Sequence, residues 1–302
     1  MALTAGKHPF YHGCGEIPTD TIIYVNDVKN WMNTQTDIPD VTDEFIYMFL
    51  HSNYFDVEKT KKTIQLYFSL RCSSPDLFLN QSPLNPDIQS GLNSVLMVPL
   101  PEATPDGYKV VIFKLSDQDP NKFVHLNAAK AMILFNDVRL SEDGIVPGYI
   151  VVCDARGYTW AHLSKLNLNV LRVYMKYMQE AKPVRLKGLH VIYSAKIIDK
   201  LMTVAKPFMK SELQKLIKIH TSDNMNDFFN YVPQEIMPED YGGKAKSLFT
   251  LHEENRILME EKYTQWIAEE ENLLKIACEL RHLQKNSSST ESVGTFKSLS
   301  ID

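Results

Sequence analysis

The sequence predicts an α/β protein in which a small all-helical unit precedes a larger layer built on a mainly parallel sheet. Apolar residues recur at helical spacing over residues 40–72, and short uninterrupted apolar runs alternate with helical patterns over 109–217. A further set of apolar residues at helical spacing begins near residue 257. With 302 residues, 44% of them hydrophobic and 23% charged, the chain can bury a sizeable core and needs no disulfide or metal to fold.

We predict two helices in the N-terminal unit. Asp40 is placed to cap the first helix, and the second spans residues 57–71. The expected inner face of the first helix carries Phe45, Ile46, Phe49 and Leu50. Residues 73–107 are rich in Asn, Ser and Asp and contain six prolines, so we expect a long connection there rather than a core element.

We predict the α/β layer from three apolar runs, at residues 109–115, 149–153 and 189–193. These runs lack the polar alternation of a half-exposed strand, which is typical of parallel strands covered on both faces. The intervening helical patterns occupy residues 122–140, 162–181 and 196–217.

The apolar residues at helical spacing after residue 257 predict one helix that packs on the rest of the protein. A polar tail is expected to follow it. The expected organisation is a helical domain at 1–85, an α/β ligand-binding domain at 86–255, a C-terminal helix at 256–285 and a tail at 286–302.

Composition argues against a nucleic-acid-binding protein and against a membrane-spanning protein. The chain has 32 basic and 37 acidic residues, a net charge of −5, whereas a nucleic-acid-binding domain is expected to be basic. No stretch approaches the roughly 18 apolar residues of a membrane span, and the first residues lack the apolar core of a secretory signal. We therefore expect a cytoplasmic protein with no nucleic-acid partner. Cys14, Cys72, Cys153 and Cys278 are widely separated, so free thiols are expected.

No catalytic motif is present that would indicate an enzyme. The sequence has no nucleophile elbow, Walker loop, dinucleotide-binding glycine motif or HExxH zinc motif. His8, His12 and Cys14 lie close together but lack a fourth metal ligand. Cys153 with His162 suggests a cysteine nucleophile only weakly, because a packed core thiol has the same pattern. We expect no enzymatic activity, no metal and no cofactor beyond a bound ligand.

One segment reverses the acidic balance of the chain. From Arg172 to Lys218 there are eleven basic residues against three acidic ones. Such a segment is either a solvated surface or a binding surface for an anionic partner such as a phosphoinositide-bearing membrane. Within it, residues 196–206 form an amphipathic helix that ends before Pro207. Ile197, Ile198, Leu201, Met202, Val204 and Ala205 make up its expected apolar side. This pattern suits a lid over apolar cargo, although an ordinary sheet-covering helix would show it too.

Four segments in order, between about residues 40 and 244, carry a resemblance to a known family. The matching positions are Phe55, Asp56, Val57, Asp154, Gly157, Tyr158, Pro183, Gly188, His190, Lys206, Pro207, Phe208, Pro238, Tyr241, Gly242 and Gly243. The chain resembles the CRAL-TRIO lipid-binding family, most closely the branch of the animal alpha-tocopherol transfer protein and cellular retinaldehyde-binding protein.

The resemblance implies an apolar ligand cavity on the sheet, closed by a gate helix that coincides with residues 196–206. By position, the ligand-binding residues would be Tyr149, Cys153, Leu166, Tyr174, Tyr177, Met178, Leu186, Leu189, Ile198, Leu201, Met202, Ala205 and Phe208. Tyr174, Tyr177 and Met178 are expected to share one helical face. Tyrosines in such a pocket suit a ligand with a hydroxyl or carbonyl at one end.

The resemblance also implies contact with anionic membranes. Arg185 and Lys187 match basic residues that hold a phosphoinositide headgroup in the tocopherol branch, whereas Glu212 and Leu216 replace others. Lys210, Lys215 and Lys218 are expected to compensate. The implied function is an intracellular carrier that transfers a tocopherol-like lipid, retinoid, carotenoid or related molecule between membranes. The alternative is a phosphoinositide-responsive signalling or trafficking adaptor that uses the pocket as a sensor.

Overall fold

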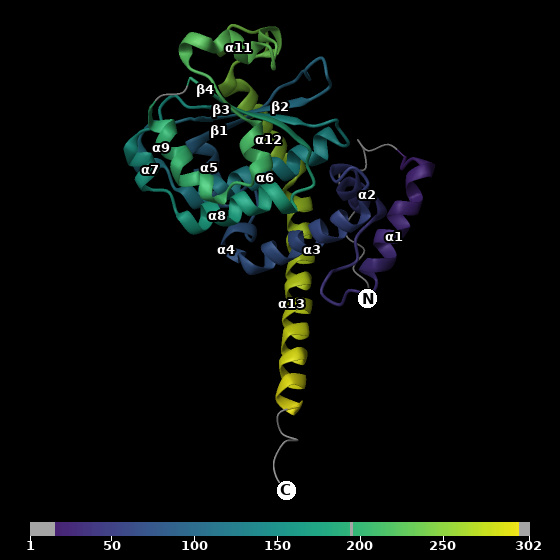
Figure 1. Ribbon diagram of the computed structural model, residues 1–302. Helices are drawn as coiled ribbons and strands as arrows, with labels where there is room; N and C mark the ends of the chain where they lie inside the picture. Colours follow the sequence, from purple (N-terminus) through teal and green to yellow (C-terminus); the bar gives the residue numbers. More distant parts are fainter. Residues whose placement is uncertain (1–15, 194–195, 296–302) are drawn as a thin grey trace.

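The computed structural model describes residues 16–193 and 196–295. Its centre is a five-stranded sheet in the order β1-β2-β3-β4-β5 (Figure 1). The strands are β1 (Val95–Pro99), β2 (Lys109–Leu115), β3 (Tyr149–Asp154), β4 (Leu186–Ile192) and β5 (Ile217–Ile219). β1 is antiparallel to β2 and the other three pairings are parallel, so the predicted α/β class with a mainly parallel sheet is confirmed.

Two strands lie where the sequence indicated other structure. Residues 73–107 are not a simple connection, because they contain α4 (Pro75–Phe78), α5 (Pro86–Ser94) and the edge strand β1. Pro75 and Pro86 stand in first helical turns, where the missing N–H costs no hydrogen bond. Pro99 ends a strand at the edge of the sheet, where proline is tolerated. Residues 196–217 were expected to be helical. The last helix of this segment ends at Leu216, and β5 follows it directly.

Helices cover both faces of the sheet, as the unbroken apolar strands indicated. α6 (His125–Asp143), α8 (Leu168–Lys176) and α9 (Lys196–Ala205) lie on one face and α11 (Met225–Phe229) on the other (Figure 1). The Phe113 ring of β2 packs edge-to-face on Phe135 of α6, with 5.5 Å between centroids. The neighbouring Ile112 points the other way and belongs to the cluster that contains Phe228 of α11.

Short helical segments connect these layers. They are η2 (Thr19–Thr21), η3 (Pro120–Lys122), α7 (Trp160–Ser164), the π-helix η4 (Tyr177–Ala181), η5 (Lys206–Phe208), α10 (Ser211–Leu216), η6 (Ser222–Asn224), η7 (Gln234–Ile236) and η8 (Glu239–Tyr241). α8 therefore passes directly into a wider π-turn at Tyr177.

The N-terminal helices are α1 (Ile22–Met32), α2 (Asp43–Ser52) and α3 (Val57–Ser73). α2 is capped by Thr42 and not by Asp40, since the Thr42 hydroxyl accepts from the Phe45 N–H at 3.4 Å. Asp56 caps α3 by accepting from the Lys59 N–H at 2.9 Å. The predicted inner face of α2 is buried throughout.

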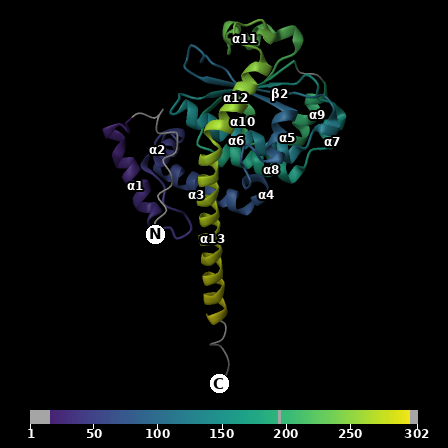
Figure 2. The ribbon, with the colours of Figure 1, turned by 180° about the vertical axis from the view of Figure 1, so that it is seen from behind.

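The C-terminal stripe forms two helices rather than one. α12 (Leu248–Lys262) packs on β1 and the α11 side of the sheet, and α13 (Thr264–Thr295) leaves the body as a long rod (Figures 1 and 2). Tyr263 lies at the break and is fully buried. α13 buries Trp266, Ile267, Leu274 and Ala277, and its backbone continues helically past residue 286, where a tail was expected.

A disulfide contradicts the expectation of free thiols. Cys72 of α3 is bonded to Cys278 of α13, with 5.1 Å between their Cα atoms, so the bond joins the N-terminal helices to the C-terminal rod. The two positions are 206 residues apart, and only the packing of α3 on α13 reveals that they meet. Cys153 is a free thiol as expected, while Cys14, His8 and His12 lie outside the described residues.

Asp154 fixes the carboxyl end of β3. Its fully buried carboxylate accepts from the Tyr241 hydroxyl at 2.9 Å and from the Arg156 guanidinium. The Arg156 guanidinium in turn lies 4.1 Å from the ring centre of Tyr193, at the end of β4. Two positions of the family resemblance, Asp154 and Tyr241, thus hold together segments that are distant in sequence.

Two buried histidines meet on the α11 face of the sheet. His190 Nδ1 and His220 Nε2 are 3.0 Å apart, and the rings are stacked with an interplanar angle of 7°. Burial lowers the pKa of His190 to about 4, with smaller effects from His220 and Lys218. Burial also lowers the pKa of His220, although Asp227 of α11 opposes this. Both rings are therefore neutral in the folded protein at pH 7.

This pair predicts a loss of stability in acid. Because the folded pKa of His190 lies below its unfolded value, its contribution is complete above about pH 6.5 and is lost as the pH falls towards 4. The free energy of unfolding in urea should fall by at most about 3 kcal/mol from this residue over that window. The variant His190→Gln should show a shallower pH slope than the wild type; equal slopes would show that the pair does not control acid stability.

Candidate ligand-binding site

α9 has the amphipathic character that the sequence predicts. Its residues turned toward the protein, buried or half-buried, are Ile197, Ile198, Leu201, Met202 and Ala205. Asp199, Lys200 and Thr203 are exposed. Val204 was expected on the apolar side, but it is 37% exposed.

The apolar face of α9 closes over β3 and β4. Ile197 and Ile198 form one cluster with Ala155 and Val191, and the half-buried residues that surround this cluster include Cys153, Leu189, Leu201 and Met202. Five predicted ligand-binding residues, Cys153, Leu189, Ile198, Leu201 and Met202, are thus brought together. Tyr158 and Leu163 belong to the same group and were missed, since they lie beyond the strand in a turn and a short helix.

The other predicted residues are arranged around this cluster. Tyr149, Leu166, Tyr174 and Met178 pack on the large core beneath the sheet. Leu186 is half-buried at the start of β4. Phe208 is half-buried, and its carbonyl accepts from Gln179 Nε2 at 2.9 Å, which ties the segment after α9 to η4.

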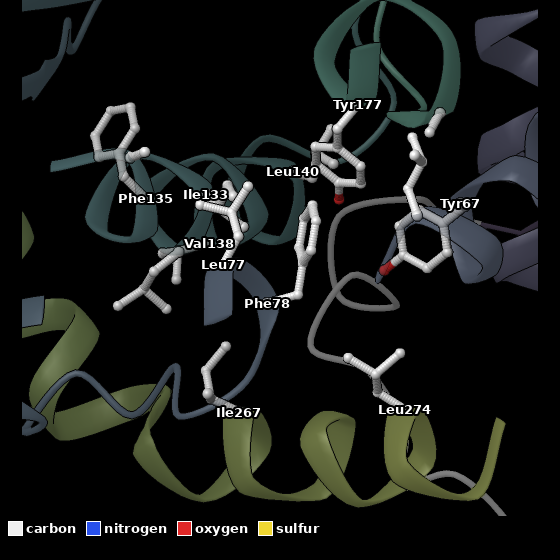
Figure 3. Packing of buried hydrophobic residues seen from close by; sticks show 14 of the residues in the cluster. Tyr67, Leu77, Phe78, Ile133, Phe135, Val138, Leu140, Tyr177, Ile267 and Leu274 are labelled. Carbon is white, nitrogen blue, oxygen red and sulfur yellow. The ribbon is translucent and has the colours of Figure 1, made fainter. Parts of the chain in front are cut away.

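Tyr177 points away from this region. Its ring is fully buried against Phe78, 4.8 Å between centroids, and near Tyr67 (Figure 3). Its hydroxyl accepts from Arg71 Nη2 at 2.7 Å. Tyr174 and Met178 pack on the same core cluster as Tyr177. That Tyr177 contacts the ligand stays a prediction.

Three side chains near these clusters, Cys153, Tyr158 and Tyr174, have raised pKa values. Burial raises the pKa of the Cys153 thiol to about 12, with a smaller contribution from Asp154. Burial is also the main cause that raises the pKa of Tyr158 and of Tyr174. All three side chains are only partly buried by their accessible surface. At neutral pH the thiol is protonated and therefore a poor nucleophile.

The five predicted phosphoinositide-binding residues do not form one patch. Arg185 donates to the His51 carbonyl from Nε at 2.8 Å and stacks on Tyr54, and Lys187 Nζ is 3.3 Å from the Tyr54 hydroxyl. Lys210 pairs with Glu180 at 2.9 Å. Lys218 contacts Tyr231 on the α11 face, and Lys215 is exposed on α10. Arg185 and Lys187 thus lie together, against the N-terminal helices.

Comparison with known proteins identifies the family to which the chain belongs. A family model described as CRAL/TRIO domain matches residues 93–243, half of the chain, and a second, described as Pinta-like, UBA domain, matches residues 19–88. The chain belongs to the CRAL/TRIO domain family, so the predicted family is confirmed. Membership implies a protein that binds a hydrophobic ligand.

The relatives are distant. Clavesin-2 of Mus musculus is 25% identical over 222 residues, which cover 72% of this chain and 68% of that protein. Alpha-tocopherol transfer protein-like of Homo sapiens is 26% identical over 223 residues, which cover 74% of this chain and 64% of that protein. The crystal structure of Sfh5 aligns over 82% of this chain and 84% of that chain, at 14% identity and a TM-score of 0.48.

Two negative findings concern the described part of the chain. Within residues 16–193 and 196–295, no three His, Cys, Asp or Glu side chains are grouped so that they could hold a metal ion. Over the same residues, no helix combines the length and the apolar character that crossing a bilayer requires.

Proposed function

We propose that the protein is a cytoplasmic carrier that binds one small hydrophobic ligand beneath α9 and transfers it between membranes. The observation that best supports this is the position of α9. Its apolar face covers half-buried Cys153 and Leu189, while its outer face carries exposed Lys200 and the following turn exposed Lys206. A short helix with this arrangement can exchange its contact with the ligand for contact with a bilayer interface.

The ligand would be a tocopherol-like molecule, a retinoid, a carotenoid or a related lipid. One relative is named for alpha-tocopherol transfer, and the residues under α9 are apolar apart from phenol and thiol groups. The raised pKa of Cys153 keeps its thiol protonated, which disfavours the alternative of a cysteine nucleophile.

Release would be aided by anionic phosphoinositide headgroups that contact the basic segment. Lys187 and exposed Lys215 are the residues of the predicted set best suited to test this. Arg185 is less suitable, since it already binds the His51 carbonyl and its loss would disturb the contact with α2. Each basic residue near an anionic surface contributes on the order of 1 kcal/mol, within a Debye length of about 8 Å.

Reversing two of these charges should slow transfer. Lys187→Glu with Lys215→Glu is expected to reduce the rate of ligand transfer to phosphoinositide-containing vesicles by roughly tenfold or more, because attraction becomes repulsion. Equilibrium binding of the ligand should not change. The measurement is fluorescence transfer of a tocopherol or retinol probe between donor and acceptor vesicles, at low and high salt.

The matched control reverses two exposed lysines of α3, Lys59→Glu with Lys62→Glu, and should transfer at the wild-type rate. Wild-type transfer that is insensitive to both salt and anionic lipid would show that the basic segment is only a solvated surface.

A further inference from the structure

The chain that connects α9 to α10 is short and has little regular structure of its own. After α9, residues 206–208 form the single turn η5, and Met209 and Lys210 are extended before α10 begins. Pro207 has no N–H group, so it cannot continue α9 by donating a main-chain hydrogen bond. If α9 moves relative to the sheet, the backbone must rotate in this connection, because the residues on both sides are helical. We call residues 206–210 the hinge segment.

One side chain binds the hinge segment on both sides of Met209. Gln179, in the π-helix η4, donates from Nε2 to the Phe208 carbonyl at 2.9 Å, and its Oε1 accepts from the Lys210 N–H at 2.8 Å. The second hydrogen of Nε2 is donated to the Met175 carbonyl at 2.8 Å, one turn earlier along the chain. Both hydrogens and the oxygen of this amide are therefore engaged, and two of the three hydrogen bonds tie the hinge segment to η4.

Two other contacts of the hinge segment are weaker links to the rest of the protein. Lys210 Nζ lies 2.9 Å from Glu180 Oε2, but the lysine side chain is 54% exposed, and solvent screens such a pair to about 1 kcal/mol or less. Gln214 Nε2 donates to the Met209 carbonyl at 3.0 Å, yet Gln214 lies in α10 on the same stretch of chain, so this bond restrains only the local turn. Gln179, which is half-buried, provides the better-shielded link.

η4 is held firmly enough to support this link. Its wide turn closes with a hydrogen bond from the Lys182 N–H to the Tyr177 carbonyl at 2.9 Å. The Tyr177 ring is fully buried, and its hydroxyl accepts from Arg71 Nη2 at 2.7 Å. Arg71 is in turn paired with Asp137 of α6 at 2.6 Å. The start of η4 is therefore fixed to α3 and α6, while the Gln179 side chain reaches the hinge segment.

We propose that Gln179 is a positioning residue that holds the hinge segment in place and thereby limits how often α9 opens. This role rests on the proposed function and deepens it, because it names what controls the rate of ligand entry and exit. The Gln179 amide binds main-chain atoms of the closed form, and these bonds must break before the hinge segment can rotate. Loading and release pass through the same open form, so loss of the bonds should raise both rates by a similar factor. The equilibrium Kd then changes little while the closed form predominates.

The test compares two substitutions of similar size in the purified full-length protein. Gln179→Leu removes the donor and the acceptor, whereas Gln179→Glu keeps an acceptor for the Lys210 N–H but cannot donate to the Phe208 carbonyl. Retinol is loaded from, and released to, phosphatidylcholine vesicles, and its fluorescence is followed by stopped flow. Both rates should rise about three- to tenfold in either variant, which corresponds to one hydrogen bond of ordinary net strength, and Kd should stay within about twofold.

A second measurement needs no ligand. The Lys210 N–H is bonded to Gln179 Oε1, so its hydrogen exchange in the ligand-free protein, followed by NMR, should be about three- to tenfold faster in Gln179→Leu. Gln265→Leu is the matched control, because Gln265 is exposed on α13, where its amide donates to Glu269 at 3.1 Å. It should match the wild type in both transfer rates and in the exchange at Lys210.

Wild-type transfer rates in either Gln179 variant would overturn this role and leave the carrier function standing. Faster release with unchanged loading would overturn it too, since Gln179 would then shape the closed site and not control its opening. If the wild type neither binds retinol nor yields any lipid on extraction, the proposed function itself falls, whereas the exchange at Lys210 still reports whether Gln179 holds the hinge segment.

Discussion

Replacing Leu201 by aspartate should abolish ligand loading while leaving the protein folded. Leu201 is half-buried at the centre of the face that α9 turns toward Cys153 and Leu189. An ionised carboxylate there would have to be desolvated against an apolar ligand, which costs several kcal/mol. Since 1.4 kcal/mol corresponds to a factor of ten, affinity for a tocopherol or retinol probe should fall at least 100-fold. Binding is measured by fluorescence titration and folding by circular dichroism.

The control lies on the same helix. Val204 is exposed, so Val204→Asp introduces the same charge into α9 with the same helix propensity but without contact to the ligand. It should bind within about threefold of the wild type. Comparable losses in the two variants would indicate that aspartate destabilises α9 as a whole and that its inner face is not the binding surface.

Removing the Arg71 guanidinium should cost about 3–5 kcal/mol of unfolding free energy. Arg71 is buried, with Nη2 2.6 Å from Asp137 Oδ2 and 2.7 Å from the Tyr177 hydroxyl. In Arg71→Ala the half-buried carboxylate of Asp137 would lose its ion-pair partner. Nearby, burial raises the pKa of Glu270 to about 7, an effect that Arg71 opposes. Urea denaturation of wild type and variant measures the loss.

An exposed ion pair provides the comparison. Lys29 and Asp43 approach to 2.6 Å on the surface, and Lys29→Ala should cost no more than about 1 kcal/mol, since solvent screens such pairs. The double variant Arg71→Leu with Asp137→Leu should recover much of the stability lost in Arg71→Ala. A loss below about 1 kcal/mol for Arg71→Ala would show that the junction of α3, α6 and η4 does not depend on this residue.

Strands covered on both faces were predictable because their apolar runs are uninterrupted. β2 was predicted with its observed bounds, Lys109–Leu115, and β3 to within one residue. β1 and β5 were not, because β1 lies among prolines that begin helices and end strands, and β5 has three residues beside a helix. Composition alone cannot distinguish a proline at the end of an element from one in a loop.

The candidate site was predictable where it depends on one helix and not where it depends on packing. The amphipathic pattern of residues 196–206 predicts which side of α9 is buried, apart from Val204. The sequence did not show that the hydroxyls of Tyr149 and Tyr177 are bound to Asp143 and Arg71, because these are tertiary contacts. The Cys72 and Cys278 pairing escapes prediction for the same reason.

The central claim is that one small hydrophobic molecule lies beneath α9. Its most direct test is to extract the purified full-length protein with organic solvent and to quantify the released lipids by mass spectrometry, with Leu201→Asp prepared in parallel. The account predicts close to one hydrophobic lipid per wild-type chain, and almost none from the variant. No lipid from the wild type, or the same mixture of lipids from both proteins, would contradict it.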